Sequence, residues 1–345
     1  MQRWRKMLSA ALMSVAFFAF TPSSVQADSC DPCCDPCGDV CGFDLGVEFL
    51  WWKACADDFD YAAVLEEGSS STIHYKSVCP DWNPGVRVTI GKSDFNCDLG
   101  VRASYTYYQP DGSASTSADN LLISPLTHPL AENLGSNVPL FDKASASWDT
   151  KYHEWDLLMT YEFSCNECHR IVSSFGAAGI YFDQEFTATL SEESKKNEIK
   201  WDADYWGVGL RSGFDYYHRL NDCMVLTSSV NGTILTGEPC AKLVQKAYTS
   251  DTLDKEVTIK DDDCCQFVPG YQIAVGLNYD MNFCDCETTL TIGYEFVQWH
   301  NLPNHRSFSD DDTTTGNKSY RSHTTSPNVR TLGFHGLTVG ARMEF

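Results

Sequence analysis

The sequence lacks long apolar helices beyond its first residues, and it has few basic side chains. After an apolar run at residues 7–20, the longest charge-free stretch is 264–279, which contains Pro269 and two glycines. A membrane-spanning helix needs roughly 20 apolar residues, so helical membrane spans are excluded there. Lys and Arg number 25 against 47 Asp and Glu, a net charge of −22. Such a surface repels nucleic acid, and we expect no nucleic-acid partner.

The N-terminus has the pattern of an export signal. Arg3, Arg5 and Lys6 precede the apolar run, and the small residues Val25 and Ala27 follow it. Basic residues, an apolar run and small residues before a cut define a secretory signal peptide. We predict that residues 1–27 are removed. All 16 cysteines lie beyond them, in an exported chain that meets oxidising conditions, where disulfides form.

Apolar and polar residues alternate in ten segments, with little helical periodicity between them. In "FDLGVEFLW", residues 43–51, every odd-numbered side chain is apolar, while Asp44, Gly46 and Glu48 take the other face. The remaining segments are 86–91, 99–107, 154–163, 171–182, 206–217, 224–235, 271–281, 290–296 and 337–345. Many approach the roughly 9 to 11 residues with which a tilted strand crosses a bilayer. One apolar and one glycine-rich, charged face suit a membrane barrel, and only closure removes its unpaired edges.

The connections between these segments alternate in length. Long gaps such as 54–85, 109–147, 237–267 and 301–331 are separated by short turns such as "KSDFNC" and "HRLNDC". Outer-membrane barrels have short periplasmic turns and long outer loops. We therefore predict an all-β, transmembrane antiparallel β-barrel of about ten strands (about 8 to 14) in the bacterial outer membrane, with both termini periplasmic. Residues 28–41 would form a cysteine-rich periplasmic segment and residues 42–345 the barrel.

Ring residues end the predicted strands on alternate sides. Outward-running strands end in Trp51-Trp52, Tyr107-Tyr108, Tyr181-Phe182, and Phe296 with Trp299, and inward-running strands end in Tyr161 with Phe163, Tyr216-Tyr217, Tyr279 with Phe283, and Phe345. Amphipathic rings gather where lipid headgroups begin, so this phase predicts two interfacial girdles.

Both ends of the barrel region carry a family resemblance. "GFDLGVEFLWWKA" (42–54), "YWGVGLRSGFD" (205–215) and the C-terminal "FHGLTVGARMEF" (334–345) resemble pore-forming outer-membrane proteins typified by the Legionella major outer membrane protein and its cysteine-rich chlamydial relatives. The resemblance implies a porin-like role and, for the chlamydial branch, a disulfide-linked envelope. The terminal Phe345 matches the general signal read by the barrel-assembly machinery. The five cysteines in "DSCDPCCDPCGDVC" (28–41) depart from the Legionella pattern.

The polar faces of the predicted strands carry charges that would line the lumen and set ion selectivity. These candidates are Glu48, Arg87, Arg102, Asp156, Glu162, Arg211, Asp215, Glu295 and Arg342. The alternative is a salt-bridged plug, because side chains nearly fill a barrel of about eight strands. Additional strands within 54–85 or 237–267 would widen the pore.

The predicted function is an outer-membrane porin for passive diffusion of small hydrophilic solutes, crosslinked into the envelope by disulfides. A structural or adhesive protein with a plugged barrel is the alternative. No G-x-S-x-G or H-E-x-x-H motif occurs, so we predict no enzyme, no cofactor and no metal. A protease site at the outer rim stays open, since five histidines lie in or beside predicted outer loops: His74, His128, His300, His305 and His323.

The cysteines fall outside the middles of the predicted strands. Five are expected outside the cell: Cys55, Cys79, Cys240, Cys264 and Cys265. Eleven are expected in the periplasm: Cys30, Cys33, Cys34, Cys37, Cys41, Cys97, Cys165, Cys168, Cys223, Cys284 and Cys286. Both numbers are odd, so at least one thiol on each side cannot pair within the chain. We expect disulfides to self or to other cysteine-rich envelope proteins, with outer-membrane lipid as the remaining partner.

One cysteine turn has a second interpretation. Cys165, Cys168 and His169 form a C-x-x-C-H, the spacing of c-type haem attachment. Haem needs a packed pocket and normally a second axial ligand, which a short turn between membrane strands lacks. Zinc is the other use of such cysteine pairs, but exported thiols favour bridges. We therefore interpret the motif as one of four cysteine-bearing periplasmic turns.

Overall fold

A computed structural model describes residues 42–56, 59–66, 72–92, 99–126, 140–166, 168–262, 265–283, 286–315 and 318–345. These belong to the second of two compact units, Cys37–Phe345. The predicted signal peptide and the cysteine-rich segment 28–41 lie outside the described residues. Within the described ranges the regular structure is β-strand, and no helix there is long and apolar enough to span a membrane.

The described ranges contain fourteen strands. Their bounds are β1 (Phe43–Ala56), β2 (Asp60–Glu66), β3 (Thr72–Ser77), β4 (Trp82–Lys92), β5 (Leu99–Tyr108), β6 (Asp111–Ile123), β7 (Phe141–Asn166), β8 (His169–Ser191), β9 (Lys195–Asn221), β10 (Met224–Thr249), β11 (Thr252–Asp262), β12 (Gln266–Phe283), β13 (Cys286–Thr315) and β14 (Lys318–Glu344).

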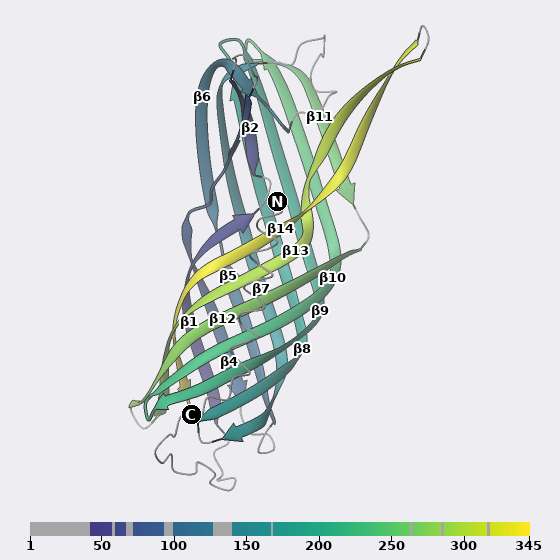
Figure 1. Ribbon diagram of the computed structural model, residues 1–345. Coiled ribbons are helices and arrows are strands. Elements are labelled where there is room, and N and C mark those ends of the chain that lie inside the picture. The colour runs from purple at the N-terminus through teal and green to yellow at the C-terminus, as the bar shows by residue number, and fades with distance from the viewer. Residues whose placement is uncertain are drawn as a thin grey trace. The chain divides into compact units, whose positions relative to one another are not determined.

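Ten of these strands close into an antiparallel barrel (Figure 1). Around the wall the order is β7, β5, β4, β1, β14, β13, β12, β10, β9 and β8, and pairing of β8 with β7 closes the ring. Each predicted segment lies in one of these ten strands, so the predicted fold class is confirmed. Phe43 and Phe345 exchange two backbone hydrogen bonds of 3.2 and 2.9 Å, and we call the barrel end that they mark the terminal end.

At the other end the wall continues into what we call the distal sheet. It comprises β2, β3, β6 and β11 together with the parts of β7–β10 that continue beyond the barrel beside them (Figure 1). The gaps 54–85, 109–147 and 237–267, which the sequence predicts as long loops, contain β2, β3, β6 and β11 instead. None of these four strands adds a place to the ring of ten, so they lengthen the structure without widening the barrel.

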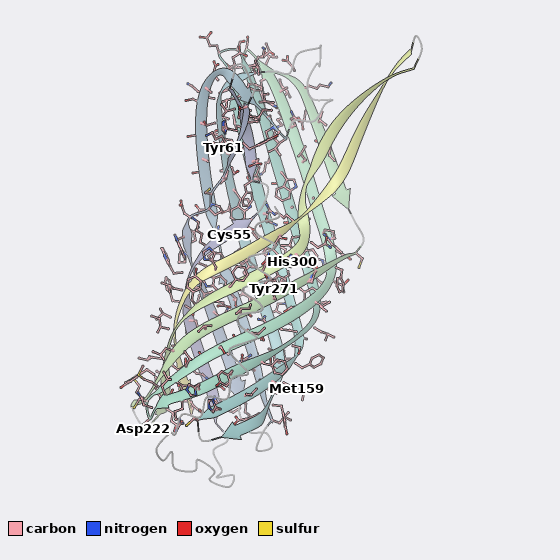
Figure 2. The ribbon with its side chains drawn as sticks, viewed as in Figure 1. Cys55, Tyr61, Met159, Asp222, Tyr271 and His300 are labelled. Atoms are coloured by element: carbon pink, nitrogen blue, oxygen red, sulfur yellow. The ribbon has the colours of Figure 1, made fainter. Side chains whose placement is uncertain are left out.

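Side chains alternate strictly between the two faces of the wall. Along β1, Leu50, Trp52 and Ala54 are buried, whereas Phe49 and Trp51 are exposed on the outside. Exposed apolar side chains cover the outside of all ten strands, as Met159 of β7 illustrates (Figure 2). An apolar outer face and a charged inner face are what a barrel in hydrocarbon requires. Which end faces the periplasm stays a prediction.

The β13–β14 hairpin diverges from the distal sheet (Figure 1). The register of this pair shifts between Trp299 and Leu302 and again between Pro303 and Arg306. Asn301 adopts a left-handed conformation with φ of 64°, and its amide donates a 2.7 Å hydrogen bond to the Phe267 carbonyl on β12. The bend therefore begins where β13 leaves the barrel wall.

Candidate functional site

Ion pairs cross the lumen at the level of Arg87. The Arg87 guanidinium on β4 lies 2.9 Å from Glu48 on β1 and 2.9 Å from Glu295 on β13. Its Nε also donates to the Thr106 hydroxyl at 3.0 Å. Gln272 on the neighbouring strand β12 donates to Glu295. One arginine thus joins two carboxylates on different strands, and charge-assisted hydrogen bonds of this kind are strong.

A second group of ion pairs joins β5, β7 and β9 inside the lumen. Arg211 on β9 contacts Glu154 and lies 3.3 Å from Asp156, both on β7. Arg102 on β5 lies 3.1 Å from Asp215 on β9. Arg87, Arg102 and Arg211, together with the carboxylates that they contact, form what we call the ion-pair layer. The carboxylates of this layer are Glu48, Glu154, Asp156, Asp215 and Glu295.

The layer brings together most of the predicted lumen residues. Seven of the nine belong to it: Glu48, Arg87, Arg102, Asp156, Arg211, Asp215 and Glu295. The other two, Glu162 and Arg342, lie nearer the terminal end, where Glu162 is 3.8 Å from Arg170 and Arg342 is 2.9 Å from Asp44. Sequence reasoning missed Glu154, although it begins a predicted strand with the same inward parity as Asp156.

A layer of aromatic rings lies beside the ion pairs. The Phe334 ring on β14 is 5.2 Å from Tyr108 on β5, 4.9 Å from Tyr152 on β7, and within 6.3 Å of Phe182 on β8 and Trp52 on β1. Trp299 Nε1 on β13 donates to the Tyr152 hydroxyl at 3.2 Å. Tyr152 in turn donates to Glu154 at 2.7 Å, which joins the two layers.

These contacts connect opposite walls of the barrel. β7 and β13 are five places apart in the ring of ten, and β14 and β8 are also five places apart. The Trp299–Tyr152 hydrogen bond and the Phe334–Phe182 ring contact therefore each span the full lumen. Further into the distal sheet, Arg330 of β14 donates to Gln184 of β8, again across the barrel.

The girdle pairs predicted at the ends of the outward-running strands divide between the two faces. Trp51, Tyr181 and the other first members are partly exposed on the outside, whereas Trp52, Tyr108, Phe182 and Trp299 are buried in the lumen. Successive side chains of a strand point to opposite faces, so adjacent rings cannot both face lipid. This alternation was the available signal for the aromatic layer.

Charged residues cover the outer wall just beyond the apolar band. Lys151 of β7 lies 2.9 Å from Asp183 of β8, and Asp183 faces Asp204 of β9 in register. Burial and the neighbouring Asp183 carboxylate raise the pKa of Asp204. At the start of β9, in the distal sheet, a hydrogen bond from Lys196 lowers the pKa of Glu198. The outer surface thus changes from apolar to charged within two residues of Tyr181.

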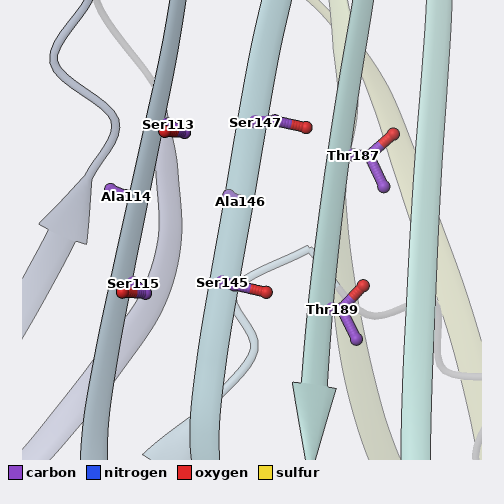
Figure 3. Close-up of a pocket in the computed structure, with 8 residues that line it drawn as sticks. All are labelled: Ser113, Ala114, Ser115, Ser145, Ala146, Ser147, Thr187 and Thr189. Atoms are coloured by element: carbon purple, nitrogen blue, oxygen red, sulfur yellow. The ribbon is translucent and has the colours of Figure 1, made fainter.

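The outer face of the distal sheet carries a shallow pocket of about 470 Å³ (Figure 3). Hydroxyl groups from three neighbouring strands line it: Ser113 and Ser115 of β6, Ser145 and Ser147 of β7, and Thr187 and Thr189 of β8, with Ala114 and Ala146 between them. No ionisable side chain lines this pocket, so it offers hydrogen bonds without an acid, a base or a nucleophile activated by one.

The described residues hold no group of three or more His, Cys, Asp or Glu side chains placed to bind a metal. Of the rim histidines, His74 is exposed on β3, and His300 on β13 lies 3.1 Å from the Thr331 hydroxyl (Figure 2). His128 and the side chains of His305 and His323 lie outside the described part. A rim protease site therefore stays an untested alternative.

Six cysteine side chains are placed by the structure. Cys55, Cys79, Cys240 and Cys265 lie toward the distal sheet, whereas Cys168 and Cys223 lie in turns at the terminal end. Only the backbone is described for Cys165 and Cys286, and the others lie outside the described residues: Cys30, Cys33, Cys34, Cys37, Cys41, Cys97, Cys264 and Cys284. The six that are placed thus lie at the two barrel ends, and the side of the membrane that each end faces stays a prediction.

Residues 36–345 match the family model of the Legionella pneumophila major outer membrane protein precursor. No curated protein matches the sequence. Solved structures with a similar fold include the Escherichia coli outer membrane protease OmpT, at 11% identity, a TM-score of 0.46 and coverage of 89% of this chain and 98% of that one.

Two further structures show weaker similarity. The Ralstonia pickettii toluene transporter TbuX has 9% identity, a TM-score of 0.32 and coverage of 88% of both chains. A major outer membrane protein from Thermus thermophilus has 12% identity, a TM-score of 0.30 and coverage of 88% of this chain and 99% of that one. At such scores these similarities say nothing about function.

Proposed function

The chain belongs to the Legionella major outer membrane protein family and is therefore an outer-membrane protein, and from this premise we propose that it is a membrane anchor with a closed lumen. In this proposal the barrel holds the distal sheet at the surface of the outer membrane and does not pass solutes freely at rest. The distal sheet would be the part that meets other envelope components.

The hydrogen bond between Trp299 and Tyr152 carries this proposal, because it spans the full width of the barrel. Barrels with an aqueous channel have about 16 to 18 strands, whereas side chains nearly fill those of about eight. Ten strands with inward Arg, Glu, Trp and Tyr side chains belong to the filled class. The ion-pair layer adds a second barrier, since a solute crossing it must separate Arg87 from Glu48 and Glu295.

A gated porin is the second candidate, and the lining near the terminal end favours it. The side chains that point inward there are small, as at Gly46, Thr89 and Ser104. They leave room for solutes on that side of the ion-pair layer. Passage would then require the ion pairs and the aromatic layer to open. This version retains the porin function that the sequence resemblance implies.

Solute uptake by proteoliposomes separates the two candidates. We expect liposomes with the wild-type barrel to exclude small sugars, and a Tyr152→Ala, Trp299→Ala, Phe334→Ala variant to admit them. A Trp51→Ala, Tyr181→Ala variant, which removes outward rings instead, is the matched control. Rapid sugar uptake through the wild-type protein would reject the closed lumen and favour the porin.

We also propose that disulfides fasten the barrel into the envelope. The support is the placement of cysteines at both barrel ends and the odd number expected on each side of the membrane. Non-reducing gels of freshly isolated envelopes are expected to show high-mass species that collapse to monomer with reductant. Monomer alone on such gels would contradict the crosslinking.

A further inference from the structure

The C-x-x-C-H turn brings its histidine against a second histidine. His169 begins β8, and the β8–β9 register places it directly opposite His218. Their rings stack with centroids 4.6 Å apart and planes 15° from parallel. The two Nδ1 atoms lie 3.2 Å apart, on the outside of the wall at the terminal end.

That separation suits two ligands of one metal ion. Imidazole nitrogen binds Zn²⁺ at about 2.0 to 2.1 Å, so two nitrogens on one ion lie about 2.9 Å apart at a right angle and about 3.4 Å apart at a tetrahedral angle. The observed 3.2 Å falls between these limits. We propose that His169 and His218 form a binding site for a divalent transition metal of the copper or zinc type, for which imidazole is a preferred ligand.

The surroundings of the pair are compatible with a bound cation. Arg170, the next residue in the chain, has the opposite strand parity. Its guanidinium lies 4.3 Å from the Tyr217 ring and 3.8 Å from Glu162, on the lumen side. Its charge is thus directed away from the two imidazoles. Water would complete the site, because the described residues hold no group of three or more His, Cys, Asp or Glu side chains placed to bind a metal.

Metal binding requires a local rearrangement that the position permits. Nearly parallel rings direct their lone pairs along parallel planes, so at least one ring must turn about its Cβ–Cγ bond to converge on one ion. The Tyr216 hydroxyl lies 2.7 Å from His169 Nδ1, and it must release this contact or become a further ligand. His169 is exposed on the barrel surface, where such a rotation meets little resistance.

Another outward histidine in this protein provides a built-in comparison. His153 contacts the Tyr105 hydroxyl at 2.7 Å, much as His169 contacts Tyr216, yet its ring neighbours are tyrosines. A tyrosine contact at the membrane interface therefore does not require a second histidine. His169 differs from His153 because a nitrogen of a second imidazole, that of His218, lies beside its own. A metal ion would use this pair of nitrogens.

Copper binding tests the site in the refolded full-length barrel. Thiols are blocked with N-ethylmaleimide, Cu²⁺ is titrated, and nitrogen hyperfine structure in the electron paramagnetic resonance spectrum reports imidazole ligands. His169→Gln and His218→Gln should each lower the copper affinity of the tightest site about tenfold or more. Losing a residue that only supports a metal ligand already costs about tenfold, so losing a ligand should cost at least as much. The double variant should lose no more than either single variant, since both residues serve one ion. His153→Gln is the matched control.

The outcomes decide the proposal independently of whether the lumen conducts. Unchanged copper affinity in both variants, or an equal loss in His153→Gln, would overturn it. Loss of tight binding on thiol blocking alone would also overturn it, by assigning the metal to the cysteine turns. Heat-modified migration on gels confirms that each variant has folded before it is compared.

Discussion

At the scale of single residues, the lumen depends on arginines that each serve more than one carboxylate. Arg87 holds Glu48 and Glu295, and Arg211 holds Glu154 and Asp156. Removing one partner of a buried pair leaves an uncompensated charge, which costs more than the pair contributes when intact. Substituting one of these arginines should therefore lower the stability of the barrel more than breaking an exposed ion pair on the outer wall.

Replacing Arg87 with alanine tests this difference. The change leaves two carboxylates without their cation, and we expect a loss of about 3 to 5 kcal/mol in the free energy of unfolding. Lys151→Ala, which breaks an exposed pair with Asp183, should cost less than about 1 kcal/mol. Urea unfolding of both variants in the same lipid vesicles measures the two values. Equal losses would show that the ion-pair layer is not a buried network.

The raised pKa of Asp204 should make the folding stability of the barrel depend on pH. Its pKa is raised above the ordinary 3.8 by burial and by Asp183, so its ionised form costs stability above the raised pKa. That cost disappears as the pH falls through the raised pKa to below the unfolded value. Asp204→Asn should thus stabilise the barrel at pH 7 by less than about 1 kcal/mol and have no effect near pH 3. Unfolding midpoints at both pH values measure this, and a larger gain in acid would contradict it.

The sequence predicted which residues face the lumen, but not what they would do there. Strand parity placed Arg87, Arg211 and Glu295 inward, and in the structure each of them forms an ion pair with a residue on another strand. Parity alone does not give the height at which two inward side chains meet. That height follows from the stagger of the strands around the barrel, so the Phe334–Tyr152 contact had no signal in either strand.

At the scale of elements, membrane-crossing strands were predictable and their extensions were not. Large apolar side chains mark one face of β1 and β5, whereas the β6–β7 pair alternates alanine with serine in "KASAS" (143–147) and "SASTS" (113–117). Alanine contrasts weakly with serine, so these segments resemble loops in composition. They nevertheless pair over seven successive residues, from Asp111 to Ser117, with an inward alanine row.

The bend of β13 depends on Asn301, which tolerates positive φ better than branched residues do. Asn301→Val should destabilise the bend by about 1 to 2 kcal/mol, the usual cost of a left-handed conformation for residues other than Gly, Asn and Asp. Asn301→Gly keeps the conformation accessible and removes only the hydrogen bond to Phe267. Hydrogen exchange of β13 amides near residue 300 should accelerate more in the valine variant. Equal acceleration would assign the bend to the hydrogen bond alone.

At the scale of the whole molecule, the two barrel ends differ in what they present. The terminal end carries short turns such as Asp222–Cys223, and the distal end carries a sheet that continues beyond the apolar band. Because charged side chains such as Asp183 and Lys151 begin at that boundary, the distal sheet must lie in water. The sequence predicts that this water is outside the cell.

Epitope insertion tests the orientation. A tag between Ser250 and Asp251, whose positive φ values mark a tight turn of the distal sheet, should bind antibody on intact cells. A tag in the Asp222–Cys223 turn should bind only after the outer membrane is permeabilised, and it serves as the matched control. The reverse pattern would place the distal sheet and the termini on the opposite sides.

The central claim is that side chains close the lumen from wall to wall, and bilayer conductance of the refolded protein tests it most directly. The Tyr152→Ala, Trp299→Ala, Phe334→Ala variant serves as the reference that reports insertion, because loss of the cross-barrel contacts should give discrete current steps. For the wild-type barrel we predict a baseline current without regular steps at the same protein dose. Uniform, stepwise and ohmic conductance of the wild-type protein would contradict the closed lumen.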